Sequence, residues 1–101
     1  ISIEFYYSEV DKVNLLFRAF DIYPTDGYMD YRECELFQYT TDPQFPLTME
    51  MWKYVVYLTG GGISRGLDID QFNSTYYLYK HRLGTDINKD WKSVMEHSGI
   101  I

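Results

Sequence analysis

The stretch Asp21–Glu33, DIYPTDGYMDYRE, decides how this chain folds. It has acidic residues at both ends, a proline and a glycine between them, and one aliphatic residue, Met29, in its second half. Pro24 and Gly27 are residues that interrupt regular structure and mark a turn. The residues before and after this stretch have helical spacing, so we interpret it as a loop between two helices.

The apolar residues on either side of this loop are spaced as in amphipathic helices. Val13, Leu16 and Phe17 recur at steps of three and four, which places them on one helix face. Similar spacing continues beyond Pro43 and Pro46, which cannot lie within a helix. The predicted helices span residues 8–20, 31–40, 48–59 with Thr48 as N-cap, 68–82 and 86–97.

A second stretch, Gly60–Gln71 (GGGISRGLDIDQ), repeats the organisation of the first. It also separates two predicted helices, and Leu67 lies at the place that Met29 holds in the first stretch. An internal repeat of this kind indicates that one supersecondary unit occurs twice. We therefore predict an all-α fold for residues 1–101 as a single domain. Its parts are a first unit over 8–40, a second unit over 48–82 and a C-terminal helix over 86–97.

Both stretches resemble the loops of the EF-hand family, which bind calcium. Those loops place oxygen ligands at positions 1, 3, 5, 7, 9 and 12, and a glycine at position 6. The first stretch is one residue longer than this pattern, and the extra residue falls at Tyr23–Pro24. The resemblance places Asp21 at position 1, Asp26 at 5, Gly27 at 6, Met29 at 8, Asp30 at 9 and Glu33 at 12.

The first loop is open to two interpretations. The resemblance implies a weak calcium site formed by Asp21, Asp26, Asp30 and Glu33. In the alternative, the loop is a solvated turn in which Asp21 and Asp26 accept hydrogen bonds from backbone amides. No cofactor other than this calcium ion is expected.

The second loop keeps the family's length but not its ligands. Gly60 falls at position 1 and offers no side-chain oxygen, Arg65 brings a positive charge, and Gln71 replaces the bidentate glutamate at position 12. Asp68 is the one anionic candidate, and a hard divalent cation requires several. We expect no calcium in this loop. The resemblance implies that the two units pair through a short bridge at Met29 and Leu67.

The resemblance implies a calmodulin-like or light-chain-like subunit that binds a partner's amphipathic helix independently of calcium. The alternatives are a calcium sensor that uses the first loop, or a structural accessory subunit of a large assembly. The C-terminal helix is expected to dock into the groove of its own domain and close it, in preference to contributing to a partner's surface. The aromatic segment 1–7 is expected to pack on the domain or to bind a partner. The expected groove residues are Phe17, Phe37, Trp52, Val56, Tyr76 and Tyr79, with Trp91 near the rim.

Composition excludes several other functions. The net charge of −6 and the scattered basic residues argue against binding nucleic acid, which requires clustered lysines and arginines. No apolar run reaches the roughly 20 residues that span a bilayer. Cys34 is the single cysteine, which is typical of an intracellular protein, here cytoplasmic or cytoskeletal. We do not expect an enzyme, because no nucleophile–base pair is apparent.

Overall fold

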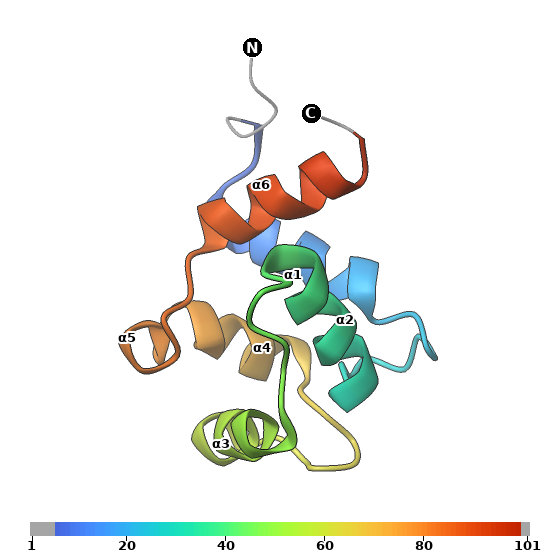
Figure 1. Ribbon diagram of the computed structural model, residues 1–101, viewed down its shortest axis with the longest axis vertical. Coiled ribbons are helices and arrows are strands. Elements are labelled where there is room, and N and C mark those ends of the chain that lie inside the picture. The colour runs from blue at the N-terminus through green and yellow to red at the C-terminus, as the bar shows by residue number, and fades with distance from the viewer. Residues whose placement is uncertain (1–5, 100–101) are drawn as a thin grey trace.

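A computed structural model describes residues 6–99, and this part of the chain consists of helices joined by loops (Figure 1). Residues 6–99 contain no β-strand beyond two isolated bridges. The predicted all-α class is therefore confirmed. In chain order the helices are α1 (Glu9–Phe20), α2 (Tyr31–Thr41), α3 (Met49–Thr59), α4 (Ile69–Tyr76), α5 (Lys80–Leu83) and α6 (Ile87–His97).

Side chains at the helix starts fix where the helices begin. Thr48 accepts a hydrogen bond from the Met51 amide at 3.2 Å, which confirms its predicted role as N-cap of α3. Helices α2 and α4 both begin with a capping box, in which the N-cap aspartate and the residue at the third helical position satisfy each other's backbone amides. Asp30 and Glu33 form this arrangement in α2, and Asp68 and Gln71 form it in α4.

The predicted continuous helix over residues 68–82 is wrong, because the chain breaks between α4 and α5. The Tyr79 amide donates to the Ser74 carbonyl at 2.9 Å, a wider turn than an α-helix makes. The Thr75 carbonyl, which would accept from Tyr79 in a continuous helix, instead accepts from the Thr85 hydroxyl at 2.6 Å. The side chain of Thr85 therefore competes with the helix for a backbone acceptor and helps to end α4 at Tyr76.

The centre of the molecule is an aromatic cluster contributed by α1, α2 and α4. Phe20 meets Phe37 edge-on with ring centroids 5.0 Å apart, and Phe37 meets Phe72 at 5.5 Å. Phe17 also packs against Phe72, with ring centroids 5.8 Å apart. All four rings are buried, and tilted or edge-to-face pairs of this kind contribute about 0.5–1.5 kcal/mol beyond their burial. This cluster holds α1 against α4.

The two loops meet at Met29 and Leu67. The Met29 amide donates to the Leu67 carbonyl at 2.8 Å, and the Leu67 amide donates to the Met29 carbonyl at 2.9 Å. Both side chains are buried in the core. Since α2 begins just after Met29 and α4 just after Leu67, this bridge fixes the starts of the two helices relative to each other.

Helix α6 packs on α1 and α2, as Figure 1 shows at the upper end of the molecule. Its buried residues Ile87, Trp91 and Val94 lie on one face, and the ring of Tyr7 lies 5.6 Å from that of Trp91. The predicted docking of the C-terminal helix on its own domain is therefore confirmed, with α1 and α2 as the surface that it covers, whereas the closure of a groove by this helix stays a prediction. The expectation for the segment 1–7 concerns mostly residues 1–5, which lie outside the described part. No helix within residues 6–99 is both long and apolar enough to span a membrane.

Candidate functional site

The first loop brings three of its four predicted calcium ligands together. Carboxylate oxygens of Asp21, Asp26 and Glu33 all lie within 4.8 Å of one another. Asp30 is not part of this group, because its side chain caps α2 by accepting from the Glu33 amide at 3.0 Å. Of the four predicted ligands, Asp30 is therefore the one that does not lie with the others. The capping box that starts the helix uses the carboxylate that the family pattern assigns to position 9.

Backbone amides already occupy these carboxylates. Asp21 accepts from the amides of Asp26, at 3.2 Å, and Gly27, at 2.8 Å, and Asp26 accepts from the Tyr28 amide at 3.0 Å. This is the pattern expected of a solvated turn, in which aspartates satisfy the loop's own donors. The three acidic groups remain close enough to share one hard cation.

Glu33 is the most deeply buried acid in this loop, with 1% of its surface exposed. It accepts hydrogen bonds from the amides of Tyr23 at 2.9 Å and Asp30 at 3.0 Å. Burial raises the pKa of its carboxyl group, these two hydrogen bonds oppose the rise, and the charges of Asp30 and Asp21 add to it. A bound cation would reverse the unfavourable effect of the neighbouring charges.

The second loop is closed by protein hydrogen bonds. The Gln71 side chain donates to the Gly60 carbonyl at 3.0 Å and accepts from the Asp68 amide at 2.8 Å, so it joins the start of the loop to the start of α4. Gly62 and Gly66 exchange two further backbone hydrogen bonds. Arg65 points to the first loop, where its guanidinium lies 4.8 Å from the centre of the Tyr28 ring. This loop therefore has an internal closure where a calcium loop would have an ion.

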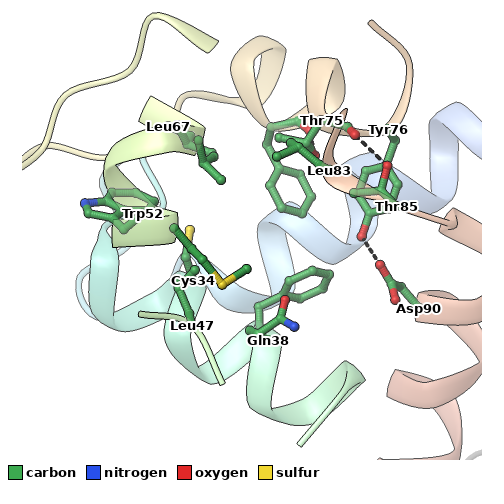
Figure 2. A pocket seen from close by; sticks show the side chains of 14 residues that line it. Cys34, Gln38, Leu47, Trp52, Leu67, Thr75, Tyr76, Leu83, Thr85 and Asp90 are labelled. Atoms are coloured by element: carbon green, nitrogen blue, oxygen red, sulfur yellow. Dashed lines mark hydrogen bonds between the residues drawn. The ribbon is translucent and has the colours of Figure 1, made fainter. Parts of the chain in front are cut away.

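A cavity of about 120 Å³ lies beside the aromatic cluster, among α2, α3 and α4 (Figure 2). Its walls are mainly apolar, and Trp52 and Asp90 lie at opposite ends of it. The Trp52 indole is fixed by a hydrogen bond to the Ile63 carbonyl at 3.0 Å. The lining residues fall into three groups. The first, from α2, is Cys34, Phe37 and Gln38; the second is Leu47 from the linker between α2 and α3, Met51, Trp52 and Val55 from α3, and the bridge residue Leu67. The third, from the segment between the start of α4 and α6, is Phe72, Thr75, Tyr76, Leu83, Thr85 and Asp90.

Only part of the predicted groove lines this cavity. Phe37, Trp52 and Tyr76 do, whereas Phe17 and Val56 are buried in the core outside its walls. Trp91 is not at the rim, because α6 buries it against α1 and α2 and leaves 3% of it exposed. Tyr79 lies past the break after α4, so it no longer continues the inner face of that helix and does not line the cavity.

Sequence reasoning missed Asp90, the acidic residue of the cavity wall. The Tyr76 hydroxyl donates to its Oδ2 atom at 2.5 Å. Burial is the main cause that raises the pKa of the Asp90 carboxyl group, and the negative charges of Asp86 and Asp42 raise it further. The hydrogen bond from Tyr76 and the positive charge of Lys89 oppose this rise. Burial also raises the pKa of Tyr76 well above 10, so its hydroxyl remains a donor.

In comparisons with known proteins, no family model, curated protein or solved structure matches this chain. What the chain does is therefore inferred from the two loops and the cavity. Cys34 adds no reactive group to the cavity, since burial raises the pKa of its thiol and its Sγ atom donates to the Met29 carbonyl at 3.6 Å.

Proposed function

We propose that this chain is a pair of EF-hand units that acts as a calmodulin-like binding subunit. Its cavity takes an apolar side chain from a partner's amphipathic helix, and calcium is not required. The observation that carries this proposal is the Gln71 side chain, which closes the second loop through Gly60 and Asp68. With that closure, α3 and α4 keep their positions around the cavity without a metal ion.

The likeness between the two loops supports the pairing of EF-hand units. Each loop ends with a bridge residue, Met29 or Leu67, followed at once by the N-cap aspartate of the next helix. In each, the side chain at the third helical position also reaches back to the loop's beginning: Glu33 to the Tyr23 amide and Gln71 to the Gly60 carbonyl. The same geometry thus arises from different residues, which is what a duplicated unit predicts.

The cavity supports the binding of an apolar side chain. Met51 lines it while remaining 46% exposed, so the cavity wall continues onto the surface. Helix-in-groove recognition uses such a surface, with apolar anchors of the bound helix entering pockets between the helices of the binding domain. Methionine suits this role because its flexible side chain adapts to different partners.

A displayed library of amphipathic helical peptides, selected on the full chain in the presence of a calcium chelator, tests this proposal. The selected peptides should bind equally well with and without calcium. Met51→Glu places a charge at the cavity mouth and should weaken their binding about tenfold or more. Tyr57→Glu makes the same kind of change on α3 at a residue that is 82% exposed and outside the cavity walls, so it should leave binding unchanged.

Failure to select any peptide, or binding that Met51→Glu does not weaken, would overturn the proposal. Circular dichroism of both variants shows whether the helices are intact. This control is informative because both substituted residues are exposed, so that a charge at either position remains in contact with solvent.

A second candidate function, a calcium sensor, is favoured by the grouping of Asp21, Asp26 and Glu33. Calorimetric titration of the full chain with calcium tests it, together with the variant Glu33→Gln. Glutamine is a well-matched change, since Gln71 forms the equivalent capping box in the second loop. A micromolar site that Glu33→Gln abolishes would support the sensor, whereas no heat of binding in the wild-type chain would rule it out.

A further inference from the structure

We infer that Asp90, held at one end of the cavity by the Tyr76 hydroxyl, binds a lysine or arginine of the partner helix. This inference rests on the proposed function and adds a specificity-determining residue to it. The partner is then a cationic amphipathic helix with an apolar side chain that enters the cavity and a basic residue on the same face that reaches Asp90.

The first support for this is the unequal use of the two carboxylate oxygens of Asp90. Oδ2 accepts from Tyr76 at 2.5 Å, and no hydrogen bond within residues 6–99 reaches Oδ1. A carboxylate has roughly four sites for hydrogen-bond donors, so most of its capacity remains. The side chain is half-buried and lines the cavity at the end opposite Trp52, as Figure 2 shows. A donor that follows an apolar side chain into the cavity would meet this oxygen.

The charges around Asp90 favour a cation as a further partner of its carboxylate. Asp86 and Asp42 carry the same negative charge as the Asp90 carboxylate and raise its pKa, whereas the positive charge of Lys89 lowers it. The whole chain also has a net charge of −6. An arriving lysine or arginine would therefore be attracted over a distance, and would then form a charge-assisted hydrogen bond in a partly buried site.

The size of the cavity favours one side chain over a small-molecule ligand. Sites for such ligands usually measure about 300–1,000 Å³. A cavity of about 150 Å³ accepts a benzene ring, and the cavity here measures about 120 Å³. It therefore matches one aliphatic or small aromatic side chain, which a helix would present beside its basic residue.

Asp90 has a simpler explanation, in which it ties α6 to α4 through Tyr76 and contacts no partner. The variant Asp90→Asn separates the two explanations. The asparagine oxygen still accepts from the Tyr76 hydroxyl, so the tie between the helices remains, whereas the charge is lost. Glu96→Gln removes one negative charge from an exposed position of the same helix and serves as the matched control.

The experiment selects the same displayed library of amphipathic helical peptides on the 101-residue wild-type chain, on Asp90→Asn and on Glu96→Gln. A selected peptide is then synthesised with lysine or glutamine at its enriched basic position, and its affinity is measured by calorimetry. We expect lysine or arginine to be enriched at one position near the apolar anchor. The lysine peptide should bind the wild-type chain and Glu96→Gln about tenfold more tightly than the glutamine peptide, and Asp90→Asn should bind both equally.

Three results would overturn the inference, and they differ in what they say of the proposed function. If peptides bind at the cavity, as shown by their loss with Met51→Glu, but lysine and glutamine peptides bind alike, Asp90 does not recognise charge and the binding subunit stands. If no peptide binds any of the three chains, the proposed function fails and this inference fails with it. A preference for lysine that persists in Asp90→Asn would also reject the role of Asp90.

Discussion

Gly66 lies against the backbone of Met29 so closely that a Cβ atom at Gly66 would stand 2.0 Å from the Met29 carbonyl oxygen. Its φ angle of +97° is also one that side-chain-bearing residues rarely adopt. This contact comes from the bridge, because Leu67, the next residue, exchanges both backbone hydrogen bonds with Met29. The approach of the two loops therefore depends on the absence of a side chain at position 66.

Gly66→Ala should destabilise the protein by about 3 kcal/mol or more, since it combines backbone strain with a clash that only a shift of the bridge can relieve. Gly84→Ala is the matched control. Gly84 also has a positive φ angle, +64°, but a Cβ atom there meets no other atom within 4 Å. The Gly84→Ala variant should therefore lose only roughly 1–2 kcal/mol of stability, which is the cost of a side chain in the left-handed conformation. Urea denaturation measures both, and equal losses would contradict the close contact.

Gln71→Glu tests the closure of the second loop. The carboxylate keeps an acceptor for the Asp68 amide but loses the donor to the Gly60 carbonyl, and it places a negative charge beside that oxygen. We expect a loss of about 1 kcal/mol in the free energy of unfolding. Gln44→Glu makes the same change at an exposed residue of the linker before α3 and should have no measurable effect. If the two variants were equally stable, Gln71 would not close the loop.

The all-α class and the positions of the loops were predictable because they depend on local rules. Glycine and proline mark the loops, and the N-cap at Thr48 follows from side-chain chemistry that acts within one turn. The break after Tyr76 was not predictable in this way. It involves the hydroxyl of Thr85, ten residues further on than its acceptor Thr75, and no helical period contains that contact.

Of the residues that line the cavity, only those on helices that run as predicted could be identified from the sequence. Phe37 and Trp52 lie on inner faces that the apolar spacing identifies, and both line the cavity. Asp90 gives no such signal, because an acid beside Trp91 on an amphipathic helix is ordinarily a solvated residue. Its place in the wall follows from the way α6 folds back over α1 and α2, which is a property of the tertiary structure.

Trp91→Ala should release α6 from the rest of the molecule. Trp91 is 3% exposed and is one of the buried residues that hold α6 on α1 and α2, so its truncation should cost about 3–5 kcal/mol. Leu78→Ala removes a large apolar side chain that is 73% exposed and should change the free energy of unfolding by less than about 0.5 kcal/mol. Urea denaturation compares the two. A Trp91→Ala chain as stable as Leu78→Ala would show that α6 is not packed as described.

The stability of the chain should depend on pH through Asp90. Its pKa is raised from the ordinary 3.8, chiefly by burial, so in the interval above 3.8 and up to that raised value the folded state holds more protons than the unfolded state. The contribution of Asp90 to the free energy of unfolding is therefore highest in acid. It falls as the pH rises through this interval and stays low at neutral pH.

Asp90→Asn removes this titration while keeping an acceptor for Tyr76. The difference in unfolding free energy between the variant and the wild-type chain should therefore shift in favour of the variant on going from about pH 4 to about pH 7. Glu96→Gln, which removes a negative charge from the exposed side of the same helix, is measured alongside as the control for the loss of charge. Urea denaturation at both pH values measures this. A shift of the opposite sign would mean that the Tyr76 hydrogen bond and Lys89 outweigh burial and that the Asp90 carboxylate is stabilised in the folded chain.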